Sequence, residues 1–474
     1  MKHRNHSILA AAILLFSASA CLAQTQFPDT PAGNQAKAWL EVFNAADAEK
    51  HKEFLRKNAP SRLERAEREM GLREMTGGFD IKKVEESTAT KIVALLQERV
   101  SDQFARLTVE VDAGEQHQIT RLALQGTERP TEFALPHMSE SELITDLRKK
   151  MDDVAAADRF SGAVLVAKNG KTVFANAYGL ADREKKTPNT LKTRFRLGSM
   201  NKMFTAVSTL QLVQSGKLDL KAPFGNYLTD YPNKDVASKV TIAQLLSHTG
   251  GTGDIFGPEF DKKRLELKML QDYVKLYGNR APEFEPGSRW QYSNYGFLLL
   301  GVLIEKVSGQ SYYDYVHDHI FKPAGMTGTA SEPEDQTVAD RSLGYTRFGG
   351  SSLRPNTDTL PYRGTSAGGG YSTVEDLLRF ATALQTNKLL NAQYTEMLTT
   401  GKTDTPMGGK YAYGFIDSMI NGTRCFGHGG GAPGMNGELK ICPGPGYVVA
   451  VLANMDPPAA SRVADFVTNR LPLK

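Results

Sequence analysis

The sequence is poor in cysteine, has almost no excess of charge and lacks long apolar runs, and each absence excludes a class of protein. Its 474 residues hold 57 Lys and Arg against 53 Asp and Glu, a net charge of +4 without a basic block, which argues against a nucleic-acid-binding surface. The mean hydropathy of −0.37 and the lack of long apolar stretches exclude a polytopic membrane protein. What remains, 40% hydrophobic and 23% charged, is an ordinary globular composition, and the length fits two or three domains.

Residues 1–23 have the pattern of a signal peptide. Lys2 and Arg4 form a positive start, Ile8 to Phe16 is an apolar stretch too short to span a bilayer, and small residues follow up to Ala23. Cleavage after Ala20 or Ala23 predicts an exported protein, periplasmic or secreted. Cys21 offers a less favoured alternative, membrane attachment as a lipoprotein, because Ala18-Ser19-Ala20 lacks the leucine usual in such sites.

The two remaining cysteines are Cys425 and Cys442. Export would place them where disulfides persist, and two is an even count. A disulfide between them and two free buried thiols are equally compatible with the sequence. Neither cysteine has a second metal ligand beside it, so we expect no metal site.

Residues 25–130 change from helical to strand-like patterns along the chain. Apolar residues from Trp39 to Met75 follow helical spacing, whereas Phe104 to Val111 alternates between polar and apolar residues, with neighbouring strands expected at Lys91 to Arg99 and Gln118 to Leu124. This order predicts an α+β domain. The opening AWLEVFNAADAEKHKEF resembles NTF2-like domains, which implies a curved antiparallel sheet wrapped on helices in an accessory domain. Residues 131–144 then read as a linker.

Residues 145–474 are predicted to form a larger domain. A hairpin is expected where Asn169-Gly170 separates two apolar runs, since Asn-Gly fits a type I′ turn. Strands are expected at Gly437 to Cys442 and Tyr447 to Ala453, followed by a helix from about Ala459 to Arg470. Helical runs, notably Ser199 to Gln214 and the largely apolar Phe297 to Val307, fill the middle. Strands from both ends therefore predict one antiparallel sheet closed by the two termini of the domain, with helices around it.

The strongest chemical signal is Ser199-Met200-Asn201-Lys202. Residues three apart share one helical face, and here that face continues into the apolar stripe of the same helix. Burial lowers the pKa of a lysine until it can accept a proton, and a serine hydroxyl needs such a base to become a nucleophile. The alternative is a helix-capping serine beside a lysine whose amine extends to solvent.

The second signal is Tyr292-Ser293-Asn294, which precedes the apolar helix. A tyrosine shuttles protons if cationic neighbours depress its pKa, and the asparagine suits orienting a substrate amide or Lys202. The alternative is a capped helix start with surface polar residues.

The third signal is the segment Phe426 to Gly434, in which a strand is expected to end in glycines that let substrate approach. His428 and Gly430 are candidate substrate-positioning residues, and the N–H groups of Ser199 and Gly431 are a candidate oxyanion hole. The alternative is a glycine-rich loop with a bystander histidine. A rival motif at His248 follows a helical run, so we expect it to be a helix end and His248 to be structural.

In this order, the three motifs resemble those of the penicillin-recognising serine hydrolases. The Tyr-x-Asn element is similar to that of class C β-lactamases, the related D-Ala-D-Ala carboxypeptidases, D-aminopeptidases and esterases. Blocks at 245–251, 285–316 and 367–384 extend the resemblance to about 330 residues. His428 stands where many β-lactamases have lysine. A mostly neutral histidine holds a lactam carboxylate less well, which favours an ester or peptide substrate.

The resemblance implies an acyl-enzyme hydrolase in which Ser199 attacks an ester, D-amino-acid amide or lactam carbonyl and Lys202 and Tyr292 move the protons. Esterase or D-peptidase activity is favoured, with a class C-like β-lactamase as the alternative. An alternative of another kind is a non-catalytic, penicillin-binding receptor. No metal or organic cofactor is implied, and the expected partner is a small-molecule or peptide substrate.

Overall fold

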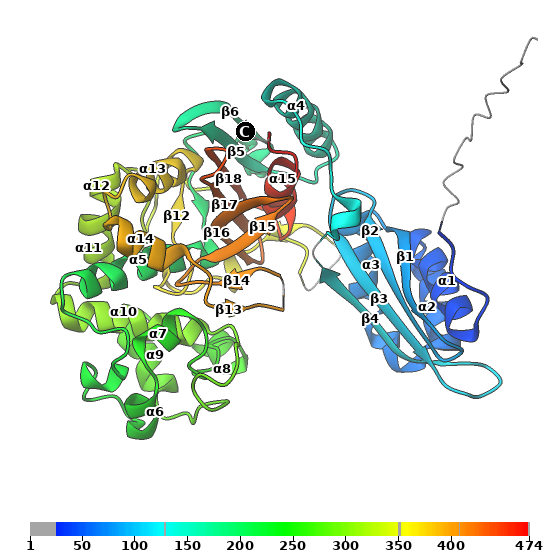
Figure 1. The fold of residues 1–474 in the computed structure, drawn as a ribbon, viewed down its shortest axis with the longest axis horizontal. Helices are drawn as coiled ribbons and strands as arrows, with labels where there is room; N and C mark the ends of the chain where they lie inside the picture. The colour runs from blue at the N-terminus through cyan, green and yellow to red at the C-terminus, as the bar shows by residue number, and fades with distance from the viewer. Residues whose placement is uncertain (1–24, 128, 349–351, 407, 473–474) are drawn as a thin grey trace, which may run out of the picture. The chain divides into compact units, whose positions relative to one another are not determined.

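The computed structural model describes residues 25–127, 129–348, 352–406 and 408–472, so the predicted signal peptide with Cys21 lies outside the described residues. The chain divides into two compact units (Figure 1). One comprises the described residues up to Gln97 together with Ala105–Gln125. The other comprises Glu98–Phe104 and the chain from Gly126 onward.

The first unit places helices before strands, as the sequence predicts. Its helices are α1 (Pro31–Asn44), α2 (Ala48–Asn58), η1 (Pro60–Arg65) and α3 (Ala66–Thr76), and its strands are β1 (Phe79–Ser87), β2 (Lys91–Glu98), β3 (Phe104–Val111) and β4 (Ile119–Thr127). The sheet has the order β1-β2-β3-β4. Trp39, Phe43 and Leu55 of the helices share a core with Leu107 and Val109 of the sheet. The α+β class is therefore confirmed, whereas the NTF2-like assignment stays a prediction.

The second unit is built on a sheet that the two ends of the unit close together. Its order is β13-β14-β15-β16-β17-β18-β5-β6 in the described residues. The strands are β5 (Gly162–Lys168), β6 (Lys171–Tyr178), β13 (Thr403–Asp404), β14 (Lys410–Tyr411), β15 (Ile416–Ile420), β16 (Thr423–Ala432), β17 (Met435–Cys442) and β18 (Tyr447–Ala453). Strand β18 pairs antiparallel with β5, from Tyr447 opposite Lys168 to Ala453 opposite Gly162. The predicted closure of the sheet is confirmed.

Helices cover both faces of this sheet (Figure 1). On one face, α4 (Glu140–Ala156) and α15 (Ala459–Thr468) share a core with Val449 and Val451 of β18. On the other face, α5 (Asn201–Gln214) and α13 (Val374–Gln385) share a core with Ala450 and Leu452. Because β18 is buried on both sides, its sequence is a continuous apolar run instead of an alternating one.

Apart from η2 (Thr131–Phe133), which precedes α4, the remaining elements lie between β6 and β13. The helices are η3 (Gly198–Met200), η4 (Phe224–Asn226), α6 (Lys234–Lys239), α7 (Ile242–Leu246), α8 (Pro258–Lys263), α9 (Leu270–Tyr277), α10 (Asn294–Ser308), α11 (Tyr312–Val316), η5 (His317–Phe321), α12 (Lys322–Ala324), η6 (Thr357–Thr359) and α14 (Ala392–Thr399). Short strands are β7 (Leu180–Asp182), β8 (Thr187–Pro188), β9 (Phe195–Arg196), β10 (Tyr345–Thr346), β11 (Arg354–Pro355) and β12 (Tyr371–Ser372). Helix α10 is buried continuously from Asn294 to Ile304, as its composition predicts.

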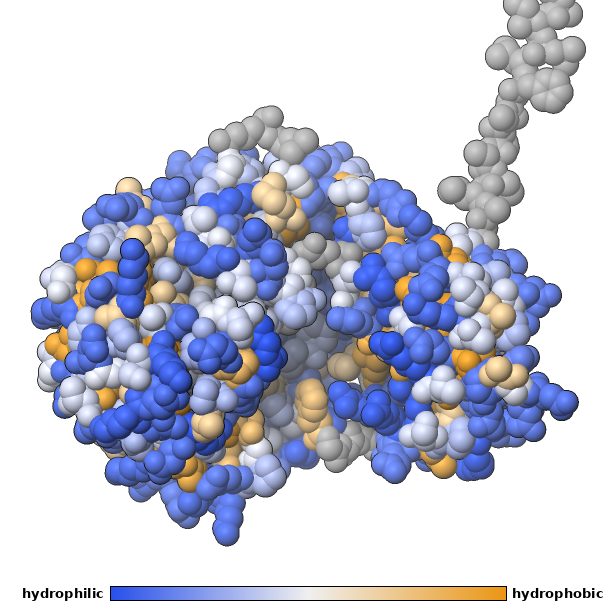
Figure 2. Space-filling model, turned by 60° about the horizontal axis from the view of Figure 1, so that its bottom comes forward, coloured by the Kyte–Doolittle hydropathy of each residue, from blue (hydrophilic) through white to orange (hydrophobic). Residues whose placement is uncertain are grey.

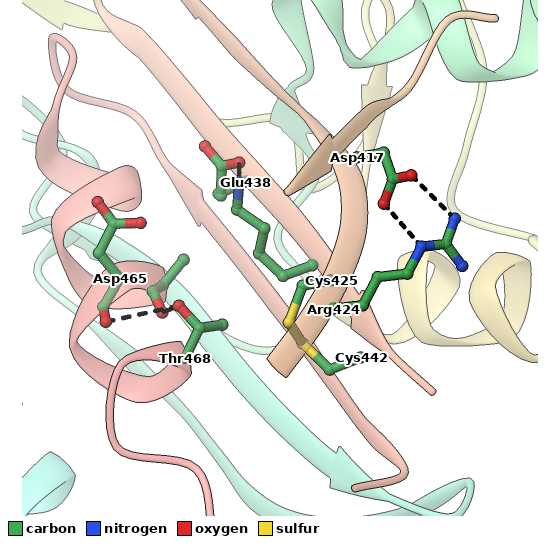
Figure 3. Close-up of a disulfide and its surroundings, with 9 residues drawn as sticks. Asp417, Arg424, Cys425, Glu438, Cys442, Asp465 and Thr468 are labelled. Carbon is green, nitrogen blue, oxygen red and sulfur yellow. Dashed lines mark hydrogen bonds and ion pairs between the residues drawn. A yellow bond between two sulfur atoms is a disulfide. The ribbon is translucent and has the colours of Figure 1, made fainter. Parts of the chain in front are cut away.

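Cys425 and Cys442 form a disulfide that joins β16 to β17, with their Cα atoms 4.2 Å apart (Figure 3). Both cysteines are buried in the core that α4 and α15 share with the sheet. Of the two alternatives that the sequence left open, the structure therefore has the disulfide. Arg424, the residue before Cys425, pairs with Asp417 of β15.

The surface is mainly polar. Figure 2 shows hydrophilic residues over most of the face in view and apolar residues in scattered groups. None of the helices in the described part of the chain is long and apolar enough to cross a membrane.

Candidate active site

The first two motif residues lie where the chain turns into a helix. Ser199 belongs to η3 and Lys202 to the first turn of α5, and the lysine amine lies 3.4 Å from the serine hydroxyl oxygen. Ser199 is partly exposed, whereas Lys202 is completely buried. The hydroxyl of Ser199 also interacts with the hydroxyl of Tyr292 and acts to lower the pKa of the tyrosine. The structure thus brings together the three side chains that the motifs predict to act together.

The amine of Lys202 is surrounded by neutral acceptors. It donates to Oδ1 of Asn294 at 2.7 Å and to the backbone oxygen of Ala367 at 2.5 Å. Burial lowers the pKa of Lys202 to about 7, although the carboxylate of Asp254 acts in the opposite direction. A neutral amine has two hydrogens, which these two acceptors take, and one lone pair, which is left for the proton of Ser199. This is the arrangement of a general base.

Tyr292 departs from the expectation that cationic neighbours depress its pKa. The Lys202 amine does lie over its ring, 4.7 Å from the centroid. Burial nevertheless raises the pKa of Tyr292 well above its ordinary value, and the interaction with Ser199 opposes this rise only in part. That part of the hypothesis is wrong, because desolvation of a phenolate outweighs the nearby amine. Tyr292 is therefore a neutral phenol near pH 7, and its role in moving protons stays a prediction.

Asn294 is held in one orientation from both ends of its amide. It opens α10, where the side chain of Ser293 caps the helix by accepting from the N–H of Gly296. Its Oδ1 accepts from Lys202, and its Nδ2 donates to both carboxylate oxygens of Asp254, at 2.9 and 3.1 Å. Two roles are predicted for Asn294, and the contact seen in the structure is the one with Lys202.

The glycines of β16 allow this strand to pack closely against the turn that carries Ser199. A Cβ atom on Gly430 would lie 1.9 Å from the backbone oxygen of Leu197, and one on Gly198 would lie 2.9 Å from the nitrogen of Gly431. Gly198 also has a φ of 54°, which disfavours other residues. As expected, the strand ends in glycines, which Ala432 alone follows, and they are paired with β17. Because these glycines lack side chains, the turn that carries Ser199 can pack directly against the strand. The oxyanion role of the Ser199 and Gly431 N–H groups stays a prediction.

Both ring nitrogens of His428 are occupied within the protein. Nδ1 lies 2.5 Å from the oxygen of Gly429, which only accepts, so Nδ1 carries the hydrogen and Nε2 accepts from the hydroxyl of Tyr411 at 3.1 Å. Burial lowers the pKa of His428 to about 3, so the ring is neutral near pH 7. The substrate-positioning role of His428 stays a prediction.

Two aromatic residues of the site were not predicted from the sequence. The ring of His248 lies 4.3 Å from that of Tyr292 and 4.4 Å from that of Tyr411, and its Nδ1 accepts from the backbone N–H of Ser293. His248 does follow the end of a helix, as expected, with a φ of 59°. The structure shows in addition that this turn supports the Tyr292 motif, and that Tyr411 comes from the two-residue strand β14.

A second serine, Ser366, lies in the sequence Gly364-Thr365-Ser366-Ala367-Gly368, which has the spacing of a nucleophile elbow. Its side chain is completely buried, so no substrate reaches it. The neighbouring Ala367 instead supplies the backbone oxygen that binds Lys202. Within the described residues, no group of three or more His, Cys, Asp or Glu side chains could hold a metal ion.

Comparison with known proteins concerns the second unit. Residues 146–473 match the profile of the beta-lactamase family. The putative penicillin-binding protein PbpX of Bacillus subtilis is 31% identical over 280 residues, which are 58% of this chain and 67% of PbpX. The crystal structure of a penicillin-binding protein from Bacillus halodurans is 32% identical, with a TM-score of 0.61 over 67% of this chain and 98% of that one. A D-stereospecific amidohydrolase from Streptomyces sp. is 27% identical, with a TM-score of 0.57 over 69% of this chain and 98% of that one.

Proposed function

Because the chain belongs to the beta-lactamase family of serine hydrolases, we propose that it hydrolyses esters or amides of D-amino acids through an acyl-enzyme on Ser199. The observation that carries the proposal is the surroundings of Lys202. Two fixed acceptors take its hydrogens, burial lowers its pKa to about 7, and its third position faces the serine hydroxyl. A lysine in this state is half neutral at neutral pH and accepts the proton that Ser199 must lose.

In the acylation step, the oxygen of Ser199 bonds to the substrate carbonyl carbon while its proton passes to Lys202. The negative charge on the carbonyl oxygen is stabilised by the N–H groups of Ser199 and Gly431, and the loss of one such donor costs about 3 kcal/mol of barrier. The protonated Lys202 then returns the proton through the hydroxyl of Tyr292 to the leaving alcohol or amine. The bond to the leaving group breaks, and the acyl group remains on Ser199.

In the deacylation step, a water molecule takes the place of the leaving group. Its proton passes by the same hydroxyl of Tyr292 to Lys202, and its oxygen bonds to the acyl carbon. The bond to Ser199 then breaks, the serine recovers a proton from Lys202, and the acid is released. No metal or organic cofactor takes part in these steps.

The preference for esters and amides over lactams rests on charge. A β-lactam carries a carboxylate, which is best held by a fixed positive charge. His428 is neutral near pH 7 because burial lowers its pKa to about 3, and its nitrogens bond to Gly429 and Tyr411. Similarity to an amidohydrolase described as D-stereospecific supports a D-amino-acid acyl group.

Export is part of the same proposal. The signal-peptide pattern of residues 1–23 supports it, and so does the disulfide between Cys425 and Cys442, since such bonds persist in oxidising compartments. The mature enzyme would then act on a small-molecule or peptide substrate in the periplasm or outside the cell.

The test is Ser199→Ala assayed against short-chain nitrophenyl esters, D-alanine amides, D-alanine peptides and nitrocefin. We expect the wild-type enzyme to turn over an ester or D-alanyl substrate faster than nitrocefin, and Ser199→Ala to lose at least about a thousandfold in rate together with covalent labelling by a fluorophosphonate, seen as a mass increase. Faster turnover of nitrocefin would instead identify a β-lactamase.

Ser208→Ala is the matched control, because Ser208 is buried on the same helix α5 and its hydroxyl has no hydrogen-bond partner among the described residues. It should keep wild-type activity and labelling. Labelling that persists in Ser199→Ala would refute the assignment of the nucleophile.

A further inference from the structure

We propose that Asp254 is a positioning residue for the catalytic base, which fixes the amide of Asn294 so that its oxygen faces Lys202 and which supplies the negative charge that acts on the lysine. This inference rests on the proposed function, because it assigns a task within the same reaction. Asp254 lies in the loop between α7 and α8 and is half-buried. Its carboxylate oxygens bond to Nδ2 of Asn294 and not to Ser199 or Lys202, so it acts through Asn294.

The first argument is the symmetry of an amide group. The oxygen and the NH₂ group of asparagine have nearly the same shape, so packing alone does not decide which of them faces Lys202. The amine of Lys202 needs an acceptor. An NH₂ group of Asn294 in that place would point its own hydrogens at the hydrogens of the amine. A carboxylate only accepts, so Asp254 binds the NH₂ end, at 2.9 and 3.1 Å, and thereby turns Oδ1 toward the lysine at 2.7 Å.

The second argument is that the structure holds Asp254 firmly. Arg280 donates from Nη1 to the backbone oxygen of Asp254 at 2.7 Å, and its guanidinium lies over the rings of Tyr277 and Tyr295, 4.3 and 4.9 Å from their centroids. The hydroxyl of Tyr277 donates to the oxygen of Ile255. A loop that only connected two helices would not need this support.

The same loop is fastened directly to the tyrosine motif. The hydroxyl of Ser293, which stands between Tyr292 and Asn294, donates to the backbone oxygen of Gly253 at 2.5 Å and lies 2.9 Å from the hydroxyl of Thr252. The positions of Asp254 and Asn294 are therefore coupled through the backbone as well as through their side chains.

The third argument concerns charge. The carboxylate charge of Asp254 opposes the effect of burial on the pKa of Lys202. The other titratable groups around the lysine are Tyr292, His248 and His428, and they are uncharged near pH 7, because burial raises the pKa of Tyr292 and lowers the pKa of both histidines. Removing the carboxylate would thus remove the negative charge that favours the protonated lysine.

The experiment is the pH dependence of kcat/KM for the wild type and for Asp254→Asn, measured on the best substrate of the panel. In the wild type, activity falls below an apparent pKa of about 7, because only the neutral Lys202 accepts the serine proton. Asparagine keeps the shape of the side chain but removes its charge and offers either end to Asn294. We expect a plateau lower by roughly tenfold or more, the effect of one charge-assisted hydrogen bond, and an acid limb shifted to lower pH.

Three further variants make the outcome decisive. Asp254→Glu keeps the charge and should keep the acid limb of the wild type. Asp254→Ser gives a second uncharged variant in case Asp254→Asn fails to fold, and it should shift the acid limb in the same direction. Asp230→Asn, at an exposed position of the same unit, is the matched control and should match the wild type in plateau and limb.

A lower plateau with an unshifted acid limb in both uncharged variants would overturn the proposal, because it would reduce Asp254 to a residue that only stabilises the fold. That failure would leave Ser199-dependent labelling of the wild type intact. If the wild type itself showed no labelling that depends on Ser199, the proposed function would fail first and the role of Asp254 with it.

Discussion

Two lysines of the second unit, both largely shielded from solvent, have pKa values shifted in opposite directions. Lys202 on α5 has no exposed surface, and the side chain of Lys440 on β17 is 15% exposed. Burial lowers the pKa of Lys202 to about 7. Burial also acts to lower the pKa of Lys440, but the carboxylates of Glu438 and Asp465 outweigh it and raise that pKa above its ordinary value. The partners of a lysine, more than its burial, decide whether it is a base or a permanent cation.

The partners differ because the two lysines lie on different elements. Lys202 faces an amide oxygen and a backbone oxygen, which accept hydrogens without carrying a charge. Lys440 lies 3.0 Å from the carboxylate of Glu438, which is two residues away and therefore on the same side of β17. Figure 3 shows Glu438 on the sheet and Asp465 on the helix beside it. The surroundings of Lys202 thus favour the neutral amine, whereas those of Lys440 favour the protonated one.

The largest effect expected from this comparison is on catalysis. Lys202→Met should lower kcat/KM by about a thousandfold, because a general base contributes that much to the rate, while circular dichroism should show a folded protein. Lys440→Met is the same substitution at the other lysine and should leave kcat/KM within about twofold. An equal loss of activity in both variants would contradict the difference in role between the two lysines.

The next effect is on stability. Lys440→Met should lower the free energy of unfolding by about 3 kcal/mol, because it leaves the buried carboxylate of Glu438 without its cation. Urea denaturation at pH 7.5 measures this. The double variant with Glu438→Gln should recover part of the loss. No recovery would mean that the methionine disturbs packing and that the ion pair is not the cause.

The last effect is limited to one range of pH and concerns Asp465. Burial raises the pKa of this carboxyl to about 6, with Lys440 opposing and Glu438 adding to the shift, against an ordinary value of 3.8. An acid whose pKa is raised on folding destabilises the fold once it ionises, so its cost is absent below about pH 4, grows through pH 6 and is complete above it. Asp465→Asn should therefore gain up to about 3 kcal/mol over the wild type at pH 8, which is the whole shift of the pKa, and nothing at pH 4, in urea denaturation at both values. A gain that is equal at both pH values would contradict this.

The sequence predicts those features that depend on local spacing. Ser199 and Lys202 lie three residues apart at a helix start, and that spacing alone brings their side chains together. The run from Tyr447 to Ala453 reads as a strand because it is apolar and short, and the structure has β18 over these residues. Asn169 and Gly170 have φ values of 50° and 76°, as the predicted turn requires.

The features that it does not predict join segments far apart in the chain. Asp254 meets Asn294 across 40 residues, and Tyr411 meets His428 from a strand of two residues that has no periodicity to detect. The raised pKa of Tyr292 depends on how completely the fold removes water from its hydroxyl. Strand β1 (Phe79–Ser87) was also missed, because most of it is exposed and its pattern is polar.

The pairing of β5 with β18 has a consequence for how the protein is made. A ribosome releases Gly162–Lys168 early, but one of the two neighbours of that strand, Tyr447–Ala453, emerges almost three hundred residues later. Contacts so distant in sequence form slowly, and until the last strands are synthesised the nascent chain cannot complete the sheet against which the nucleophile turn rests. A polypeptide that stays open until its synthesis is nearly finished is suited to threading through a secretion channel before it folds.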